Sequence, residues 1–237
     1  MPDPQLYQWA RSVVIAAWQQ ETGQSPTIFQ AQCVQALTRY ETKWATTWKP
    51  PCTESHNWGS VHATQAQVNA GVPSCEYVDH YPDGKPYAQR FRVYATDVDG
   101  CRDVIKYMRR AAGPQLDAGT STDDVWEALF WGRYYGAQCP EAIKQWGPIA
   151  ATSSFSRTGK PSTTEAGAAC DRECIRQGQD VAARVISEIA SVLHETPAPR
   201  GAGPGPGDSS TVDGSPGLLL VLLFGGVGAF LLARSRR

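Results

Sequence analysis

The sequence predicts an α+β protein that is mostly helical, with one small β-hairpin lobe and a separate C-terminal transmembrane helix. Apolar residues recur at helical spacing near both ends of the first 194 residues. Between them, around residues 75–95, the period changes to the alternation that is typical of strands. After residue 194 the composition becomes rich in Pro, Gly and Ser. The chain of 237 residues is long enough for one ordinary domain with appendages.

Two helix-start signals open the chain. Asp3-Pro4 combines an N-cap side chain with proline at the first helical position, and Gly23 is a plausible stop for the helix that follows. Ser25-Pro26 repeats the start signal. We therefore expect two successive amphipathic helices, the second one extending to about residue 44.

The middle of the chain has the pattern of a hairpin. Residues 82–85 read Pro-Asp-Gly-Lys, and Asp-Gly between β-prone segments is a hairpin signal. In the segment that follows this turn, Phe91, Val93 and Ala95 alternate with polar or amphipathic residues, as in a half-buried strand. A two-stranded lobe should therefore interrupt the helices.

Helical patterns return after the hairpin. Asp97 is expected to cap a third helix that ends near residues 113–114, and Thr122 or Asp123 a fourth. Residues 151–168 form a Ser/Thr/Gly-rich loop, and the last soluble helix is expected near residues 169–194.

Four segments make up the predicted domain organisation. Residues 1–194 form the globular domain and residues 195–216 a flexible linker. Residues 217–233 are almost wholly apolar and uncharged, at the short end of what spans a bilayer. The basic tail 234–237 carries three arginines, which should stay on the side of the membrane opposite the globular domain. The N-terminus does not have the pattern of a signal peptide.

The seven cysteines point to an oxidising compartment with two or three disulfides. They show no CxxC pair of the kind that binds zinc, and the odd count leaves one thiol over. Cys170 and Cys174 lie one helical turn apart, so we expect them to bond to other cysteines and not to each other. Spacing does not determine which cysteines pair.

Two carboxylates are candidates for catalysis. Glu41 lies in the last turns of the second predicted helix, where the helix dipole disfavours an anion, and Glu76 begins the hairpin. Two carboxylates across a cleft are what glycoside hydrolysis requires, one protonated and one charged. Trp44, Trp48 and Trp58 could form an apolar wall that raises the pKa of Glu41 and lines a sugar groove.

Three short blocks resemble glycoside hydrolase family 73, the lysozyme-like β-N-acetylglucosaminidases that include flagellar peptidoglycan hydrolases. "ALTRYETKW" is similar to the helix end "ALESGWG", which carries the catalytic glutamate, and "NWGSV" is similar to the "NLFGI" string that follows it. The segment from "CEYVDHYPDGK" to "RVYATDVDGCRD" resembles the hairpin and the helix after it. The order and spacing of the blocks agree over about residues 30–136.

The resemblance implies a lysozyme-like domain in which Glu41 and Glu76 are catalytic. The residues expected to contact the glycan are Trp44, Asn57, Trp58, Tyr77, Tyr134 and Tyr135. Two departures are visible: Lys43 stands where a glycine is usual, and residues 133–137 match the tyrosine block of the family only loosely. The cysteines and the apolar C-terminal segment are not part of the family pattern.

The expected activity is cleavage of β-1,4 glycosidic bonds in bacterial peptidoglycan. A lytic transglycosylase and a non-catalytic wall-binding membrane protein are the alternatives. A thiol peptidase built on Cys52 with His62 or His56 lacks a nucleophile motif, and His56, His62 and His80 match no standard zinc-ligand spacing. No metal or cofactor is expected.

The expected partners are peptidoglycan and a lipid bilayer. A net charge of −1 gives no electrostatic reason to expect a nucleic acid. The predicted location is a membrane, with a single-pass C-terminal anchor, in a membrane-containing virus particle or in the bacterial envelope.

Overall fold

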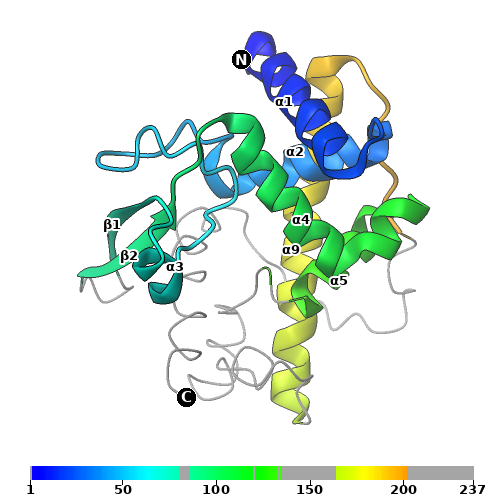
Figure 1. Cartoon of the computed structure of the whole chain (residues 1–237). Helices are drawn as coiled ribbons and strands as arrows, with labels where there is room; N and C mark the ends of the chain where they lie inside the picture. Colours follow the sequence, from blue (N-terminus) through cyan, green and yellow to red (C-terminus); the bar gives the residue numbers. More distant parts are fainter. Residues whose placement is uncertain (1, 81–85, 120, 133, 135–163, 202–237) are drawn as a thin grey trace.

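A computed structural model of the chain describes residues 2–80, 86–119, 121–132, 134 and 164–201. In this part the protein is a mostly helical α+β structure with one small two-stranded antiparallel sheet. Figure 1 shows the sheet projecting to one side of the helices. This confirms the predicted fold class at the level of helices plus a hairpin.

The first two helices begin at local capping signals. Helix α1 (Pro4–Thr22) starts at Asp3, whose side chain accepts a hydrogen bond from the Gln5 amide, and it ends at Gly23 in the left-handed conformation. Both predicted signals are confirmed. Helix α2 (Ile28–Thr42) starts at Thr27 and not at the predicted Ser25-Pro26, because Thr27 forms a reciprocal capping box with the residue at the third helical position.

The hairpin pairs β1 (Ser74–His80) with β2 (Pro86–Arg92), after the short helix α3 (Gln65–Asn69). The predicted turn at residues 82–85 lies outside the described residues. Strand β2 ends at Arg92, so the alternation expected to continue through Val93 and Ala95 stops after the buried Phe91.

Helix α4 (Asp97–Ala118) starts at Thr96, one residue before the predicted cap, and passes the expected end at residues 113–114. Ala112 has non-helical backbone angles, and this kink accommodates Pro114 inside the helix. Helix α5 (Thr122–Trp131) starts at Ser121, which precedes both predicted caps. In each case the hydroxyl that accepts the first-turn amide belongs to the residue just upstream of the predicted position.

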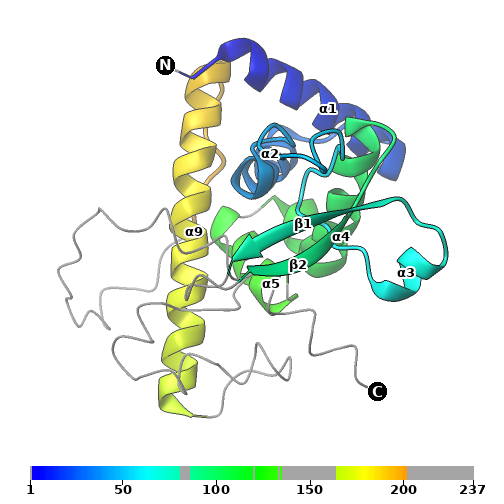
Figure 2. The same ribbon diagram turned by 90° about the vertical axis from the view of Figure 1, so that its left-hand side faces the viewer.

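Helix α9 (Glu165–Leu193) runs along the length of the helical body and packs against α2 and α5, while α1 packs against α4 (Figure 2). Its apolar face contributes Val181, Val185, Ile186 and Ile189 to the main core. The predicted helix at residues 169–194 is therefore present and begins earlier. The core that it completes holds the C-terminal end of α2, where Glu41 lies.

The first residues of the predicted linker are docked on the domain. Glu195 accepts hydrogen bonds from both terminal nitrogens of Arg11, at 2.6 and 2.7 Å. The Ala198 amide donates to the buried Gln32 at 2.6 Å, and the Arg200 guanidinium contacts Asp123. We call residues 195–201 the C-terminal strap. Polar side chains on α1, α2 and α5 thus bind the backbone and side chains of the strap, which comprises the first residues of the predicted linker.

Cysteine oxidation agrees in part with the prediction. Cys52 and Cys75 form a disulfide, and Cys174 is also disulfide-bonded. Cys33 and Cys101 are buried thiols on α2 and α4, and burial raises the pKa of both. At least two cysteines therefore remain as free thiols, whereas the odd number of cysteines predicted one thiol left over.

The structure does not test the predicted anchor. None of the helices within the described ranges is long and apolar enough to cross a membrane. Residues 202–216 of the predicted linker, the predicted span 217–233 and the basic tail 234–237 lie outside the described residues.

Candidate active site

Glu41 occupies the last turn of α2 and is only partly exposed. Burial raises the pKa of its carboxyl group from 4.5 to about 7, while a hydrogen bond with the Ser60 side chain opposes this shift. A carboxyl group with such a pKa is largely protonated in mildly acidic solution and half protonated near neutrality. A general acid must carry a proton at the pH at which it acts, and a raised pKa allows this.

An unusual turn follows Glu41. Lys43, Trp44 and Ala45 all have positive φ angles, of 45°, 59° and 64°. The Thr42 hydroxyl braces this turn, since it accepts a hydrogen bond from the Ala45 amide at 2.9 Å and donates one to the Trp58 carbonyl at 2.9 Å. Lys43 therefore adopts the left-handed conformation that glycine favours, at the position where the resemblance expects a glycine.

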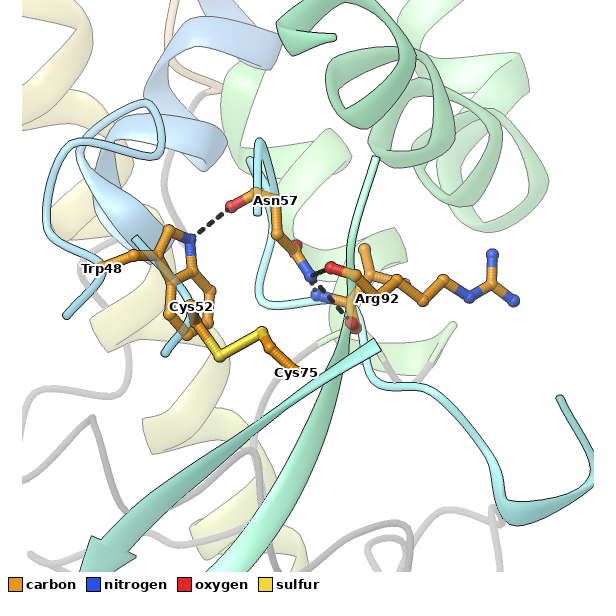
Figure 3. Close-up of a disulfide and its surroundings, with 6 residues drawn as sticks. Trp48, Cys52, Asn57, Cys75 and Arg92 are labelled. Carbon is orange, nitrogen blue, oxygen red and sulfur yellow. Dashed lines mark hydrogen bonds between the residues drawn. A yellow bond between two sulfur atoms is a disulfide. The ribbon is translucent and has the colours of Figure 1, made fainter. Parts of the chain in front are cut away.

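A second loop, residues 55–61, carries Ser60, whose side chain opposes the raised pKa of Glu41. Asn57 organises it: the side-chain oxygen accepts from the Val61 amide at 2.8 Å, and the side-chain nitrogen donates to the carbonyls of Val61 and Arg92 at 2.9 and 3.0 Å. Figure 3 shows Asn57 placed between the loop and the end of β2. Ser60 itself has a positive φ of 50°. The loop is thus a closed turn fastened to the hairpin.

Asn57 is fully buried, so its place differs from the predicted one on a substrate-binding surface. Both polar atoms of its side chain are used within the protein. Its backbone carbonyl accepts a hydrogen bond from the Trp48 indole at 2.8 Å. Asn57 holds the site together and does not face a groove.

The two tryptophans expected to contact glycan are core residues. Trp44 is 1% exposed, packs edge-on against Tyr7 and donates its indole N–H to the Gln35 carbonyl at 3.1 Å. Trp58 is 0% exposed and donates to Asp97 at 2.9 Å. A buried ring has no face free for stacking on a sugar, so these side chains serve packing of the core.

The charge of Glu41 acts on Tyr134. The Glu41 charge is among the causes that raise the pKa of the Tyr134 hydroxyl, after desolvation. That hydroxyl donates to the Gly59 carbonyl at 3.3 Å. A Cβ atom at Gly59 would lie 2.7 Å from the Tyr134 hydroxyl oxygen and 2.5 Å from Val104, so only glycine permits this approach. Tyr135 lies outside the described residues.

Glu76 lies on an exposed position of β1. It is paired across the sheet with Arg90, and the two side chains form an ion pair at 3.5 Å. More than half of the Glu76 side chain is accessible, at 54%. Glu76 therefore lacks the desolvated surroundings of Glu41, and its interaction with Arg90 is of the exposed kind.

Tyr77 belongs to an aromatic cluster at the base of the hairpin. Its ring contacts Trp48 and Phe91 edge-on, and Phe91 also packs against His62 at 4.5 Å between ring centroids. Burial lowers the pKa of His62 from 6.5 to about 4. The cluster joins the loop after α2 to both strands.

The Cys52–Cys75 disulfide ties the same two segments covalently (Figure 3). Cys75 immediately precedes Glu76, so the bond holds the start of β1 against the loop that carries Trp48. It also makes the thiol-peptidase reading untenable for the oxidised protein, since the Cys52 sulfur is not available as a thiolate nucleophile.

Several neighbours of the site were not predicted from sequence. Ser60 is one, since a serine in a short apolar loop carries no signal of its own. A second group surrounds Tyr134: Asp103 accepts from Arg92 and from the Tyr94 hydroxyl, each at 2.7 Å, and the Asp103 charge also contributes to the raised pKa of Tyr134. The string Arg-Phe-Arg-Val-Tyr at residues 90–94, which alternates charged and aromatic residues at its start, could have suggested this group.

A surface pocket of about 310 Å³ lies elsewhere on α2, lined in part by Tyr7, Arg39, Lys43 and Glu188. Residues 39 and 43 share a helix face, and residue 41 lies about 200° around the helix from residue 39. Glu41 does not line this pocket. The pocket is therefore separate from the candidate acid.

Comparisons of the chain with models of protein families, with curated proteins and with solved structures found no match. Interpretation of the site therefore depends on the geometry of Glu41 and its neighbours, together with the short blocks that resemble glycoside hydrolase family 73.

Proposed function

We propose that the protein is a membrane-anchored peptidoglycan hydrolase that cleaves β-1,4 glycosidic bonds of the bacterial cell wall, with Glu41 as the general acid. The observation that carries the proposal is the state of Glu41, a partly exposed carboxyl group at a helix end whose pKa is raised to about 7 by burial. Raised carboxyl pKa values are concentrated at catalytic sites. A lysozyme-like arrangement of helices and hairpin is part of the same proposal.

In this mechanism, protonated Glu41 donates its proton to the glycosidic oxygen as the bond between that oxygen and the anomeric carbon breaks. Water then adds to the anomeric carbon and gives up a proton, so that the products are two shorter glycans. Tyr134, whose hydroxyl is influenced by the Glu41 charge, is proposed as the described tyrosine that contacts the substrate. Glu76 is proposed as the second carboxylate, approaching the substrate from the hairpin.

The decisive experiment compares Glu41→Gln with Glu54→Gln in a turbidity or dye-release assay on purified peptidoglycan. Glu54 is an exposed carboxylate in the loop between α2 and the hairpin, and it serves as the matched control. The Glu41 variant should lose activity by a factor of roughly 10² to 10⁴, which is what general acid catalysis contributes. Near-parental turnover by Glu41→Gln would show that another group is the acid.

A lytic transglycosylase is the second candidate, and the position of Glu76 favours it. Such an enzyme uses one carboxyl group as acid and then as base, while the C6 hydroxyl of the sugar closes an anhydro ring. Only Glu41 of the two carboxylates is desolvated, because Glu76 is exposed and paired with Arg90. Full activity of Glu76→Gln together with anhydro-sugar products in a mass spectrum would establish this mechanism.

Membrane attachment is proposed from the apolar sequence of residues 217–233. The enzyme would then act on the wall from a membrane, in a membrane-containing virus particle or in a bacterial envelope. A chain that ends after residue 201 keeps the docked strap and should partition into water, whereas the full chain should require detergent. A full-length protein that stays monomeric and soluble without detergent would refute the anchor.

A further inference from the structure

We propose that the surface pocket formed by α1, α2 and α9 binds a carboxylate group of the peptide stem of peptidoglycan. Its volume of about 310 Å³ is at the small end of the range for ligand pockets, roughly 300–1,000 Å³. The pocket therefore has room for one end of a peptide and not for a whole glycan. The choice of substrate rests on the proposed function, whereas the pocket and its charges do not depend on it.

One wall of the pocket is a fixed network of charged and aromatic side chains, where the start of α1 meets the C-terminal end of α9 (Figure 2). Glu188 accepts hydrogen bonds from the Tyr7 hydroxyl and from Nη2 of Arg39, the latter at 2.6 Å. The Arg39 guanidinium lies over the rings of Tyr7 and Trp44, at 5.6 and 5.9 Å from the ring centroids. Tyr7 and Trp44 are 3% and 1% exposed, so this wall is packed without a ligand.

Two carboxylates and two cations line the pocket, and they differ in how far the protein already satisfies them. Both carboxylates accept hydrogen bonds, because Glu188 is bound as described and Asp3 accepts from the Gln5 amide at 2.9 Å. In the described part of the chain, the ammonium group of Lys43 has no hydrogen-bond or ion-pair partner. Arg39 carries N–H donors beyond the one that binds Glu188. The uncommitted groups are thus positively charged donors, which fit a carboxylate.

The backbone of Lys43 gives a second, independent reason to assign this residue a role. Its φ of 45° lies in the left-handed region, which is unfavourable for a residue with a Cβ atom and favourable for glycine. Glycine is usual at this position in the family that the chain resembles. Residues in such conformations are concentrated at binding and catalytic sites. The lysine supplies the pocket with an ammonium group that glycine would not supply.

The end of α2 separates the pocket from the candidate acid, since residue 41 lies about 200° around the helix from residue 39. A helix with its side chains is roughly 10–12 Å across. An extended peptide advances by at most about 3.3–3.6 Å per residue, so a branch of about three residues or more reaches from a glycan at Glu41 to the pocket. The stem peptides of peptidoglycan branch from the glycan and carry free carboxylates, whereas a glycan of N-acetylglucosamine alone carries none.

The test measures binding by calorimetry on the full-length protein in detergent micelles. The ligands are the synthetic stem peptide L-Ala-γ-D-Glu-L-Lys-D-Ala, the same peptide with both carboxylates converted to amides, and sodium acetate. The variants are Lys43→Gln and Glu188→Gln, with Lys49→Gln as the matched control. Lys49 is an exposed lysine in the loop after α2 and does not line the pocket. None of these measurements requires cleavage of a glycan.

The free-acid peptide should bind at least about tenfold more tightly than the amidated peptide or acetate, because a hydrogen bond between charged groups contributes about that much. Lys43→Gln should weaken binding of the free-acid peptide by roughly tenfold, and Lys49→Gln should leave it unchanged. Glu188→Gln should act in the opposite direction. It retains an acceptor for Tyr7 and Arg39 but removes a negative charge, so the free-acid peptide should bind more tightly, by roughly three- to tenfold.

Equal affinities for the free-acid and amidated peptides would overturn the proposal, and so would an unchanged affinity in Lys43→Gln. Weaker binding of the free-acid peptide by Glu188→Gln would overturn it as well, because the pocket would then prefer a cation. Acetate that binds as tightly as the peptide would exclude the stem as the specific ligand. Peptide binding as expected in a protein that does not degrade peptidoglycan would support the pocket and refute the proposed function. Degradation of peptidoglycan without peptide binding would do the reverse.

Discussion

The Tyr134 hydroxyl donates a hydrogen bond to the carbonyl oxygen of Gly59 at 3.3 Å, and the α-carbon of Gly59 has no room for a side chain. This contact joins the end of α5 to the loop that carries Ser60. Because the charge of Glu41 also acts on the Tyr134 hydroxyl, the Gly59 contact holds a residue that interacts with the candidate acid.

Gly59→Ala should therefore disturb both stability and the site. Its Cβ would lie 2.5 Å from a methyl group of the fully buried Val104, which has little freedom to move. We expect a loss of roughly 1–3 kcal/mol in the free energy of unfolding, as in overpacked cores, and reduced activity on peptidoglycan. Gly113→Ala is the matched control, because a Cβ there meets nothing within 4 Å. Equal effects of the two substitutions would contradict the packing at Gly59.

The raised pKa of Glu41 should make the protein less stable as pH rises. The folded state keeps the proton up to about pH 7, whereas the unfolded chain releases it near 4.5. Stability from this group is thus full below pH 4.5 and is lost between pH 4.5 and 7. Glu41→Gln should remove this loss and be more stable than the wild type at pH 8, by on the order of 2 kcal/mol. Urea unfolding at pH 4.5 and 8 measures it, and a variant less stable than the wild type at pH 8 would contradict the assignment.

His62 should act in the opposite direction. Its folded pKa of about 4 lies below the unfolded value of 6.5, so the neutral ring is favoured by folding. The stability from this group is present above pH 6.5 and is lost as pH falls toward 4. His62→Phe retains a ring against Phe91 and should remove the acid-induced loss. Unfolding curves recorded in the Glu41→Gln background isolate the dependence of the free energy of unfolding on pH that is due to His62. If His62→Phe leaves this dependence unchanged, another group is responsible for it.

Lys43→Gly should stabilise the protein. Lys43 caps α2 with a φ of 45°, which disfavours any residue that has a Cβ atom. Replacing it with glycine should raise the free energy of unfolding by roughly 1 kcal/mol, whereas Lys43→Ala should leave it nearly unchanged. Chemical denaturation of the three proteins decides the matter. If the glycine variant is the least stable of them, the lysine side chain contributes contacts that outweigh the backbone preference.

Breaking the contact of Arg11 with Glu195 should detach the C-terminal strap. Both side chains are mostly buried, with exposures of 13% and 19%, so removing one partner leaves the other charge without compensation. We expect Arg11→Met to lower the free energy of unfolding by roughly 1–3 kcal/mol. Arg176→Met, at an exposed ion pair within α9, should change it by less than about 0.5 kcal/mol. Hydrogen exchange in residues 195–201 should increase only in the Arg11 variant, and unchanged protection there would refute the role of this pair.

Local signals in the sequence were sufficient for the order and type of the main elements. The start of α1 at Asp3 and its end at Gly23 depend on the capping chemistry of a few adjacent residues, and such chemistry is visible without the fold. The hairpin was predicted for the same reason, since alternation and turn residues are local properties. Glu41 at the end of α2 follows from helical periodicity alone.

The surroundings of Glu41 depended on tertiary structure. Nothing in the sequence separates a tryptophan that lines a groove from one in the core, and packing of α2 against its neighbours buried Trp44 and Trp58. The pairing of Cys52 with Cys75 and the docking of the strap join segments far apart in the chain. Most of all, the raised pKa of Glu41 arises from desolvation, and the side chain that opposes it, Ser60, lies 19 positions along the chain by residue number. The sequence by itself determined which residue carries the carboxyl group, and only the fold decided its protonation, because solvent exclusion depends on what the rest of the chain places around it.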